Sequence, residues 1–320
     1  MGGALQVFRR GWLGVNKVWV IARKEIKENL TSLRYWALVG LVLVLYIVTS
    51  YQREFAIRFA GGPAGERFFF GVGNAVAQSL GLMAPILGIA LGFGAIAGER
   101  EKGTIRMVLA RPIFRDTLIN GKVLAGVILL AVAVLTSTAI GIPVTAVLQR
   151  ANLTADDYLR FAMLGVAAFL LALAYYTFAL LISVLTNRSG YSLVASVGVW
   201  FFFAFILPMI AAFVASTVLG PPPAVPQGAN ATAIRQNPQF QAYLRQYNQI
   251  SSTVQLISPN SRYSSLTSAI FQAVRGQQSN PLDVGALFAQ HWIDFAVLIS
   301  LFVIPLVLAY ILFTRTHEAK

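Results

Sequence analysis

The chain has 320 residues, of which 57% are hydrophobic and only 12% are charged, and its formal net charge is +13. Soluble domains carry about 25% charged residues, so this composition excludes an ordinary soluble protein and indicates an integral membrane protein. The sequence has no cysteine and only two histidines, which excludes disulfides and thiolate nucleophiles and leaves little basis for a metal site. The basic residues lie between apolar stretches, which favours an orienting role in a membrane over nucleic-acid binding.

Residues 13–33 predict an amphipathic helix. Apolar residues recur three or four positions apart on one face, namely Val15, Val18, Trp19, Ala22, Ile26, Leu30 and Leu33. The other face carries Lys17, Arg23, Lys24, Lys27 and Glu28. A helix with a basic polar face and tryptophans at its borders is suited to the headgroup region of a membrane.

Six apolar stretches follow, each long enough for a transmembrane helix or nearly so. We expect spans at Trp36–Tyr51, Phe70–Ala97, Val123–Leu148 and Phe161–Leu185, then from a tight turn at 187–190 to Leu219, and finally at Trp292–Phe313. The expected fold is an all-α integral membrane protein. We divide the chain into 1–35 (tail and amphipathic helix), 36–218 (spans one to five), 219–289 (a helical insertion) and 290–320 (span six and tail).

A dense charged segment, 98–122, separates the second and third spans, and its neighbours 70–97 and 123–149 contain no Lys, Arg, Asp or Glu. Gly103 can stop one helix and Thr104 can cap the next. Apolar residues at helical spacing follow, and Pro112 ends that helix. The pattern predicts a short helix at the membrane surface between the ends of two spans.

The insertion 219–289 leaves the membrane through a proline-rich stretch, Gly220–Pro226. Two sets of apolar residues at helical spacing predict two helices, the first around 240–257 and the second around 263–274, separated by a break at Ser258–Ser261. They either cover a transport pathway or hold a substrate, or they form a packing unit that stabilises a dimer.

Charge distribution predicts the orientation. Six spans place both termini on one side, and most of the 25 Lys and Arg residues fall on that side, in the N-terminal segment, in 100–122 and in the tail. Short connections rich in Lys and Arg stay in the cytoplasm. We therefore expect both termini and the charged segment to be cytoplasmic and the insertion to be extracytoplasmic.

The charged segment also resembles that of the ABC-2 type permeases, the membrane subunits of ATP-driven exporters. The shared pattern is acidic-x-acidic-Lys-Gly-Thr at 99–104, an apolar turn, Ala-Arg-Pro at 110–112, an arginine three residues later, and Gly-Lys at 121–122. In that family the segment is the coupling helix, which rests in a cleft of the ATP-hydrolysing subunit. The resemblance extends to 22–36, which is similar to the family's N-terminal elbow helix.

The resemblance implies roles for residues of about 99–115. The entry to the coupling helix would comprise Glu99, Arg100, Glu101, Lys102, Gly103 and Thr104, its apolar contact Ile105, Val108 and Leu109, and its exit Arg111, Pro112 and Arg115. It also implies a homodimer in the cell membrane of a bacterium or archaeon, surrounded by lipids, with two cytoplasmic ATP-binding subunits. ATP and magnesium would be bound by those subunits, and this chain would hold no cofactor.

The sequence contains little other chemistry. Near Gly121-Lys122 a phosphate-binding loop fails because Asp116 and Val123 stand at required glycine and hydroxyl positions. The spans lack acidic residues apart from Asp294, whereas ion-coupled transporters need intramembrane ionisable groups. Four milder polar residues line a pathway or make interhelical hydrogen bonds: Asn74, Gln78, Tyr175 and Tyr176. We expect no catalytic residue and no metal.

Two alternatives remain at this point. One is an intramembrane enzyme that modifies lipids with residues such as His291 and Asp294, and it predicts activity without ATP. The other is a structural membrane anchor of a complex, which predicts that Glu101 and Arg111 tolerate replacement.

Overall fold

The computed structural model describes residues 17–59, 68–104, 114–148, 155–223, 237–271 and 283–315, and these residues form helices and no strand. Within them, five helices are long and apolar enough to cross a bilayer. A sixth span results if Lys17–Leu30 and Leu33–Thr49, which meet at 65°, count as one broken span. The predicted all-α membrane fold is confirmed.

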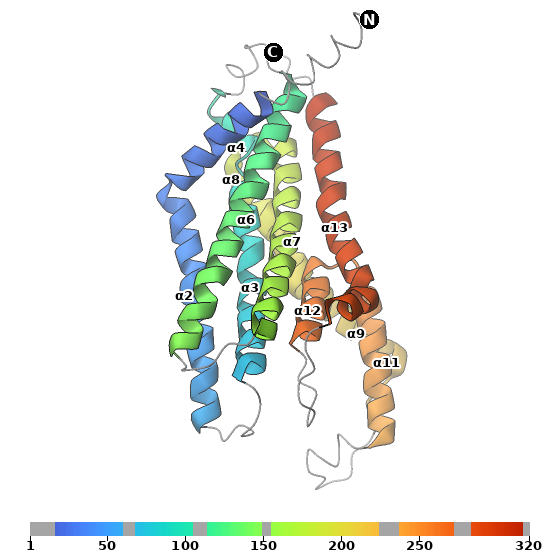
Figure 1. Cartoon of the computed structure of the whole chain (residues 1–320). Coiled ribbons are helices and arrows are strands. Elements are labelled where there is room, and N and C mark those ends of the chain that lie inside the picture. Colours follow the sequence, from blue (N-terminus) through green and yellow to red (C-terminus); the bar gives the residue numbers. More distant parts are fainter. Residues whose placement is uncertain are drawn as a thin grey trace, which may run out of the picture.

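The long helices run side by side through the molecule (Figure 1). They are α2 (Leu33–Phe59), α3 (Phe68–Gly92), α6 (Arg115–Leu148), α7 (Ala155–Leu185), α8 (Ser189–Phe201) with its continuations η1 (Phe202–Ile206) and α9 (Leu207–Leu219), and α13 (Val284–Arg315). The helix Lys17–Leu30 and the end of α13 lie at the same end, drawn uppermost and here called the upper end.

α7 is the central helix of this bundle, because it packs against α3, α6, α8 and α13. The most extensive contact is between α3 and α7, where two glycines four residues apart face the backbone of α7. A Cβ on Gly88 would lie 2.2 Å from the carbonyl oxygen of Ala172, and one on Gly92 would lie 2.6 Å from that of Tyr176. Such a pair of small residues is a common way for membrane helices to pack closely.

The helices extend beyond the apolar stretches from which we predicted them. α2 continues past Tyr51 to Phe59, and α6 begins at Arg115 instead of Val123. α13 begins at Val284, but its backbone breaks at His291, directly before the predicted start at Trp292. The helix α3 ends at Gly92 and a turn precedes the short helix α4 (Ala97–Glu101), while the candidate membrane span runs through this turn, from Val76 to Glu101. Hydropathy marks the segment that can lie in lipid, whereas backbone hydrogen bonding carries a helix on into polar surroundings.

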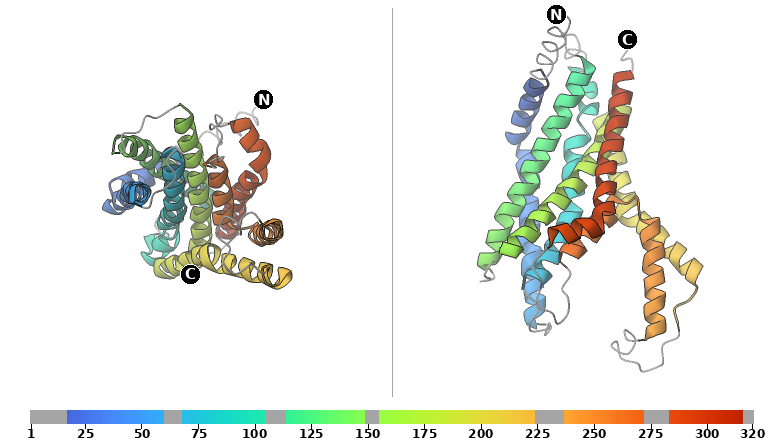
Figure 2. Two further views of the ribbon diagram at one scale, coloured as in Figure 1. Left: turned by 90° about the horizontal axis from the view of Figure 1, so that it is seen from below. Right: turned by 45° about the vertical axis from the view of Figure 1, so that its right-hand side comes forward.

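Both helices predicted in the insertion are present, as α11 (Pro238–Val254) and α12 (Pro259–Ile270). α11 packs along α9, and the two diverge from the other helices at the lower end (Figure 2). α12 lies among α3, α7 and α13. Its Tyr263 donates a hydrogen bond to the carbonyl oxygen of Ala77 at 2.7 Å, and burial raises the pKa of this phenol far above its usual value, so it remains a neutral donor.

Candidate functional site at the upper end of the bundle

The charged segment between the second and third spans begins with α4. Gly103 has a φ of +69°, a left-handed conformation that favours glycine, and it follows directly after the C-cap residue Lys102. The predicted helix stop at Gly103 is therefore confirmed. Residues 105–113, which include Ile105, Val108, Leu109, Arg111 and Pro112, lie outside the described residues.

α4 is bonded at its start to the centre of the bundle. The buried hydroxyl of Ser183, on α7, accepts hydrogen bonds from the backbone N–H groups of Ile96 and Ala97 at 3.0 and 2.9 Å. In return, the Arg100 guanidinium donates to the carbonyl oxygens of Val184 and Thr186 at the end of α7. A cation there satisfies carbonyls that have no partner within the helix.

The next bond from α4 reaches α8. The Glu101 carboxylate accepts hydrogen bonds from the backbone N–H of Ser189, at 2.9 Å, and from its hydroxyl. Ser189 is the first residue of α8, and the residue before it provides no side-chain cap. A negative charge at this position completes the helix N-terminus that the local sequence leaves open.

A third connection is a buried cluster of charges around Lys122 of α6. Its ammonium group lies 2.8 Å from a carboxylate oxygen of Glu25 and 2.7 Å from one of Glu99, and only 4% of its side chain is exposed. Glu25 belongs to the N-terminal helix and Glu99 to α4. One cation therefore holds together three elements that are distant in sequence.

The surroundings of Lys122 keep this cluster in position. A Cβ on the preceding Gly121 would lie 2.7 Å from two side-chain atoms of Ile21, so the glycine permits the close contact with the N-terminal helix. The Tyr176 hydroxyl of α7 donates to the carbonyl oxygen of Lys122 at 3.0 Å. We call the residues Glu25, Glu99, Lys122 and Tyr176 the lysine cluster.

Other parts of the segment face outward. Glu101, Lys102 and Gly103 are exposed, and Phe114, which precedes α6, is 73% exposed. Arg115 points back to the bundle and donates a long hydrogen bond, 3.4 Å, to the carbonyl oxygen of Phe313 near the end of α13. The upper end thus combines hydrogen-bonded polar contacts with an exposed surface. We call its residues Glu101, Lys102, Gly103 and Phe114 the exposed rim.

The four residues considered for a pathway have different surroundings. Asn74 and Gln78 are exposed on α3, while Tyr175 and Tyr176 are buried on α7. Tyr175 donates a hydrogen bond to Asn260 of α12. A role for these residues in lining a pathway stays a prediction.

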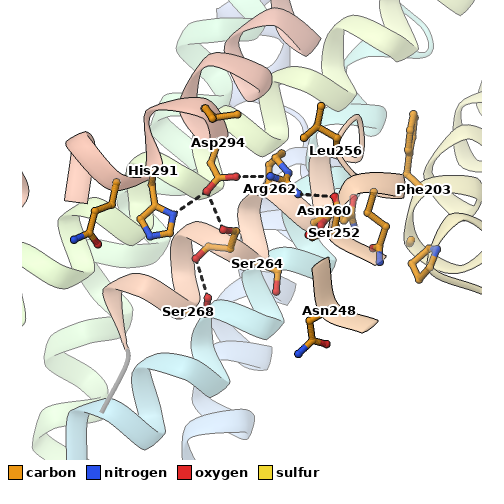
Figure 3. A pocket seen from close by; sticks show the side chains of 17 residues that line it. Phe203, Asn248, Ser252, Leu256, Asn260, Arg262, Ser264, Ser268, His291 and Asp294 are labelled. Carbon is orange, nitrogen blue, oxygen red and sulfur yellow. Dashed lines mark hydrogen bonds and ion pairs between the residues drawn. The ribbon is translucent and has the colours of Figure 1, made fainter. Parts of the chain in front are cut away.

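His291 and Asp294, the residues of the enzymatic alternative, lie together at the lower end (Figure 3). His291 Nδ1 and the Ser265 hydroxyl each lie 2.8 Å from the same carboxylate oxygen of Asp294. A nucleophilic triad requires serine to bond to histidine, with the carboxylate behind it. Here the carboxylate stands between the two, so this order is not present.

Sequence reasoning did not assign Glu25, Lys122, Ser183 or Ser189 to the site. Lys122 offered a signal, because it is the last charge before a charge-free run, and a lysine so close to an apolar helix needs a partner. One of its partners, Glu25, is 97 positions away in the chain. Nothing in the local pattern indicates such a pairing.

Comparison with known proteins agrees with this architecture. The model of the ABC-2 family transporter proteins matches residues 19–317. Two similar proteins are each described as a probable ABC transporter permease protein NosY. The one from Stutzerimonas stutzeri is 26% identical over 200 residues, which is 61% of this chain and 70% of the relative. The one from Pseudomonas aeruginosa is 29% identical over 198 residues, which is 60% and 68%. The chain therefore belongs to the ABC-2 transporter family, as a multi-pass membrane subunit of the kind that works with an ATP-binding partner.

Proposed function

We propose that this chain is the permease of an ABC exporter and that the segment 99–115 couples it to the ATP-binding subunit. The observation that carries the proposal is the attachment of α4. Its residues are bonded to the N-terminal helix and α6 through Lys122, to α7 through Ser183 and Arg100, and to α8 through Glu101. A force applied to this segment reaches four helices at once.

The mechanism follows from this rigidity. ATP and magnesium bind to the partner subunits, and closure of the two subunits moves the segment that they hold. Because α4 is fixed by charge-assisted hydrogen bonds, which are stronger than neutral ones, it transmits the movement instead of absorbing it. The helices of the permease then tilt, and the pathway opens outward. We further propose a homodimer with one ATP-binding subunit below each copy.

The exposed rim supports this contact. Glu101, Lys102 and Gly103 are exposed, Lys102 presents a positive charge, and Phe114 presents an apolar side chain. Exposed aromatic residues beside charged ones are typical of the anchoring positions in protein interfaces.

Photo-crosslinking tests the proposed contact. A photoreactive phenylalanine at Phe114 or Lys102 is expected to give a covalent product with the ATP-binding subunit in the native complex. The matched control is Tyr158, which is also exposed but lies near the start of α7, at the opposite end of the bundle. Lack of a product at both rim positions, or an equal product at Tyr158, would contradict the assignment.

Labelling of single cysteines tests the orientation of the chain in the membrane. Because the chain has no cysteine of its own, only the introduced one reacts. In right-side-out vesicles, a membrane-impermeant maleimide is expected to label Gln249→Cys at once and Lys102→Cys only after the membrane is opened. The two positions are exposed and lie on α11 and directly after α4. The reverse order of labelling would place the termini outside and remove the proposed access to cytoplasmic ATP.

A further inference from the structure

A cavity with polar and apolar lining residues lies at the lower end of the bundle, where η1, α9, α11, α12 and α13 meet. Its volume is about 870 Å³, within the roughly 300–1,000 Å³ that small-molecule sites occupy. Nine of its seventeen lining residues carry hydroxyl or carboxamide side chains, although apolar atoms make up the larger part of its surface. The neutral polar residues are Asn248, Ser252, Gln255, Asn260, Ser261, Ser264, Ser265, Ser268 and Gln290.

Its charged groups already neutralise one another (Figure 3). Asp294, which is 5% exposed, accepts hydrogen bonds from Arg262 Nη1 and the Ser265 hydroxyl, both at 2.8 Å, and lies 2.8 Å from His291 Nδ1. Arg262 Nη2 also donates to the carbonyl oxygen of Ser252. The carboxylate and the guanidinium are therefore each other's counter-ions, and neither charge is left unpaired. Arg262 Nε is buried and has no hydrogen-bond partner among the described residues.

Two irregular helices border the cavity and contribute to its wall. The chain forms a π-helical turn at η1, which supplies Phe203, and Pro208 behind it has no N–H to donate to the carbonyl of Ala204. In α13, His291 has φ −114° and ψ 18°, which breaks the helix. π-turns are frequent at functional sites, and broken membrane helices are tolerated where they line a cavity.

Apolar side chains line part of the cavity, next to polar ones such as Ser252 and Asn260. Phe203 and Leu256 lie on the far side of the cavity from His291 in Figure 3, and Pro208 and Ile293 also line it. The carboxamides of Asn248 and Gln290, in contrast, are exposed on the wall and present both donors and acceptors. The site thus pairs an apolar surface with uncharged hydrogen-bonding groups.

The geometry points to a binding site for a neutral, polyhydroxylated group, namely a sugar or the glycosyl headgroup of a lipid. A sugar places its C–H face on an apolar wall and its hydroxyls on serine and carboxamide groups. A phosphate or carboxylate needs a free cation, and an ammonium group needs a free carboxylate. Arg262 and Asp294 provide neither, because they are bonded to each other.

This binding is independent of the proposed coupling. The cavity lies away from the lysine cluster, and occupancy requires no ATP-binding subunit. A failure to bind sugars would leave the exporter proposal intact, and a failure of the rim crosslinks would leave this site intact.

Binding is tested on the full chain in nanodiscs of phosphatidylethanolamine and phosphatidylglycerol, prepared without glycoside detergents. Equilibrium dialysis measures radiolabelled maltose, and native mass spectrometry compares retention of monoglucosyl-diacylglycerol, diacylglycerol and phosphatidylglycerol. We expect preferential retention of the glycolipid. If maltose also binds saturably, the ligand can be a soluble sugar. If only the glycolipid is retained, the ligand is the headgroup of a membrane lipid.

The double variant Asn248→Leu, Gln290→Leu is expected to weaken this binding at least about tenfold, because it removes several hydrogen bonds. The matched control is Gln246→Leu, Gln249→Leu, which alters two exposed carboxamides of α11 that do not line the cavity. Gln290→Leu alone replaces the double variant if the latter loses its thermal transition. Equal binding by variant and wild type, equal retention of phosphatidylglycerol, or no binding of either sugar probe would overturn the proposal.

Discussion

Replacing Lys122 with methionine is expected to destabilise the protein by about 3–5 kcal/mol, because the change leaves two partly buried carboxylates without their cation. Glu25 and Glu99 are only 21% and 18% exposed, so water compensates little. The N-terminal helix is then expected to separate from α6, and stimulation of the ATP-binding subunit is expected to fall with it. Thermal unfolding in detergent, followed by ATPase assays of the complex, measures both effects.

Two further variants separate charge from packing. The triple variant Lys122→Met, Glu25→Gln, Glu99→Gln removes the repulsion and is expected to recover most of the stability. Lys24→Ala breaks an exposed pair with Glu28, at 3.4 Å, and is expected to change little. A Lys122→Met protein as stable as the wild type would mean that the lysine cluster does not hold the three elements together.

Replacing Gly88 is expected to have the second large effect. Even an alanine Cβ would lie 2.2 Å from the carbonyl oxygen of Ala172 and 2.8 Å from the backbone nitrogen of Tyr176. Backbone atoms cannot rotate away as side chains do, so α3 and α7 must separate along their main contact. Gly88→Ala is expected to lower the free energy of unfolding by about 1–3 kcal/mol, and Gly88→Val is expected to prevent folding.

The matched control is Gly40→Ala on α2, where a Cβ would meet nothing within 4 Å. There the substitution is expected to be neutral or to stabilise the helix by up to about 1 kcal/mol, since alanine has the higher helix propensity. Size-exclusion profiles and melting temperatures of the two variants provide the measurement. Similar profiles for Gly88→Ala and Gly40→Ala would show that the helices can adjust at Gly88.

Sequence reasoning found the features that depend on local composition. The apolar stretches gave the spans, the period of Tyr243, Tyr247 and Ile250 gave α11, and Gly103 marked the end of α4. These succeed because burial in lipid and backbone conformation impose short-range patterns. The charged segment between two spans is a feature of the same kind, because composition alone sets its borders.

Features that depend on distant partners could not be predicted. No periodicity relates Lys122 to Glu25, and the position of α12 among α3, α7 and α13 rests on contacts such as Tyr263 with Ala77. No proline or glycine marks the break at His291, although the predicted span begins directly after it, at Trp292. The exact helix ends could not be predicted either, because hydropathy indicates which residues can lie in lipid and not where backbone hydrogen bonding ends.

The position of α12 among α3, α7 and α13 also affects how the protein folds during its synthesis. α3 and α7 can pair once the ribosome has passed Leu185, but Tyr263 must still reach the carbonyl oxygen of Ala77, 186 positions earlier, before the lower half of the bundle is complete. Until then, glycine faces of α3 such as Gly81, which contacts the Tyr263 ring, lie uncovered. During the synthesis of the residues between Leu185 and Tyr263, this part of α3 therefore has no partner, and a membrane chaperone that binds small-residue helix faces can bind there.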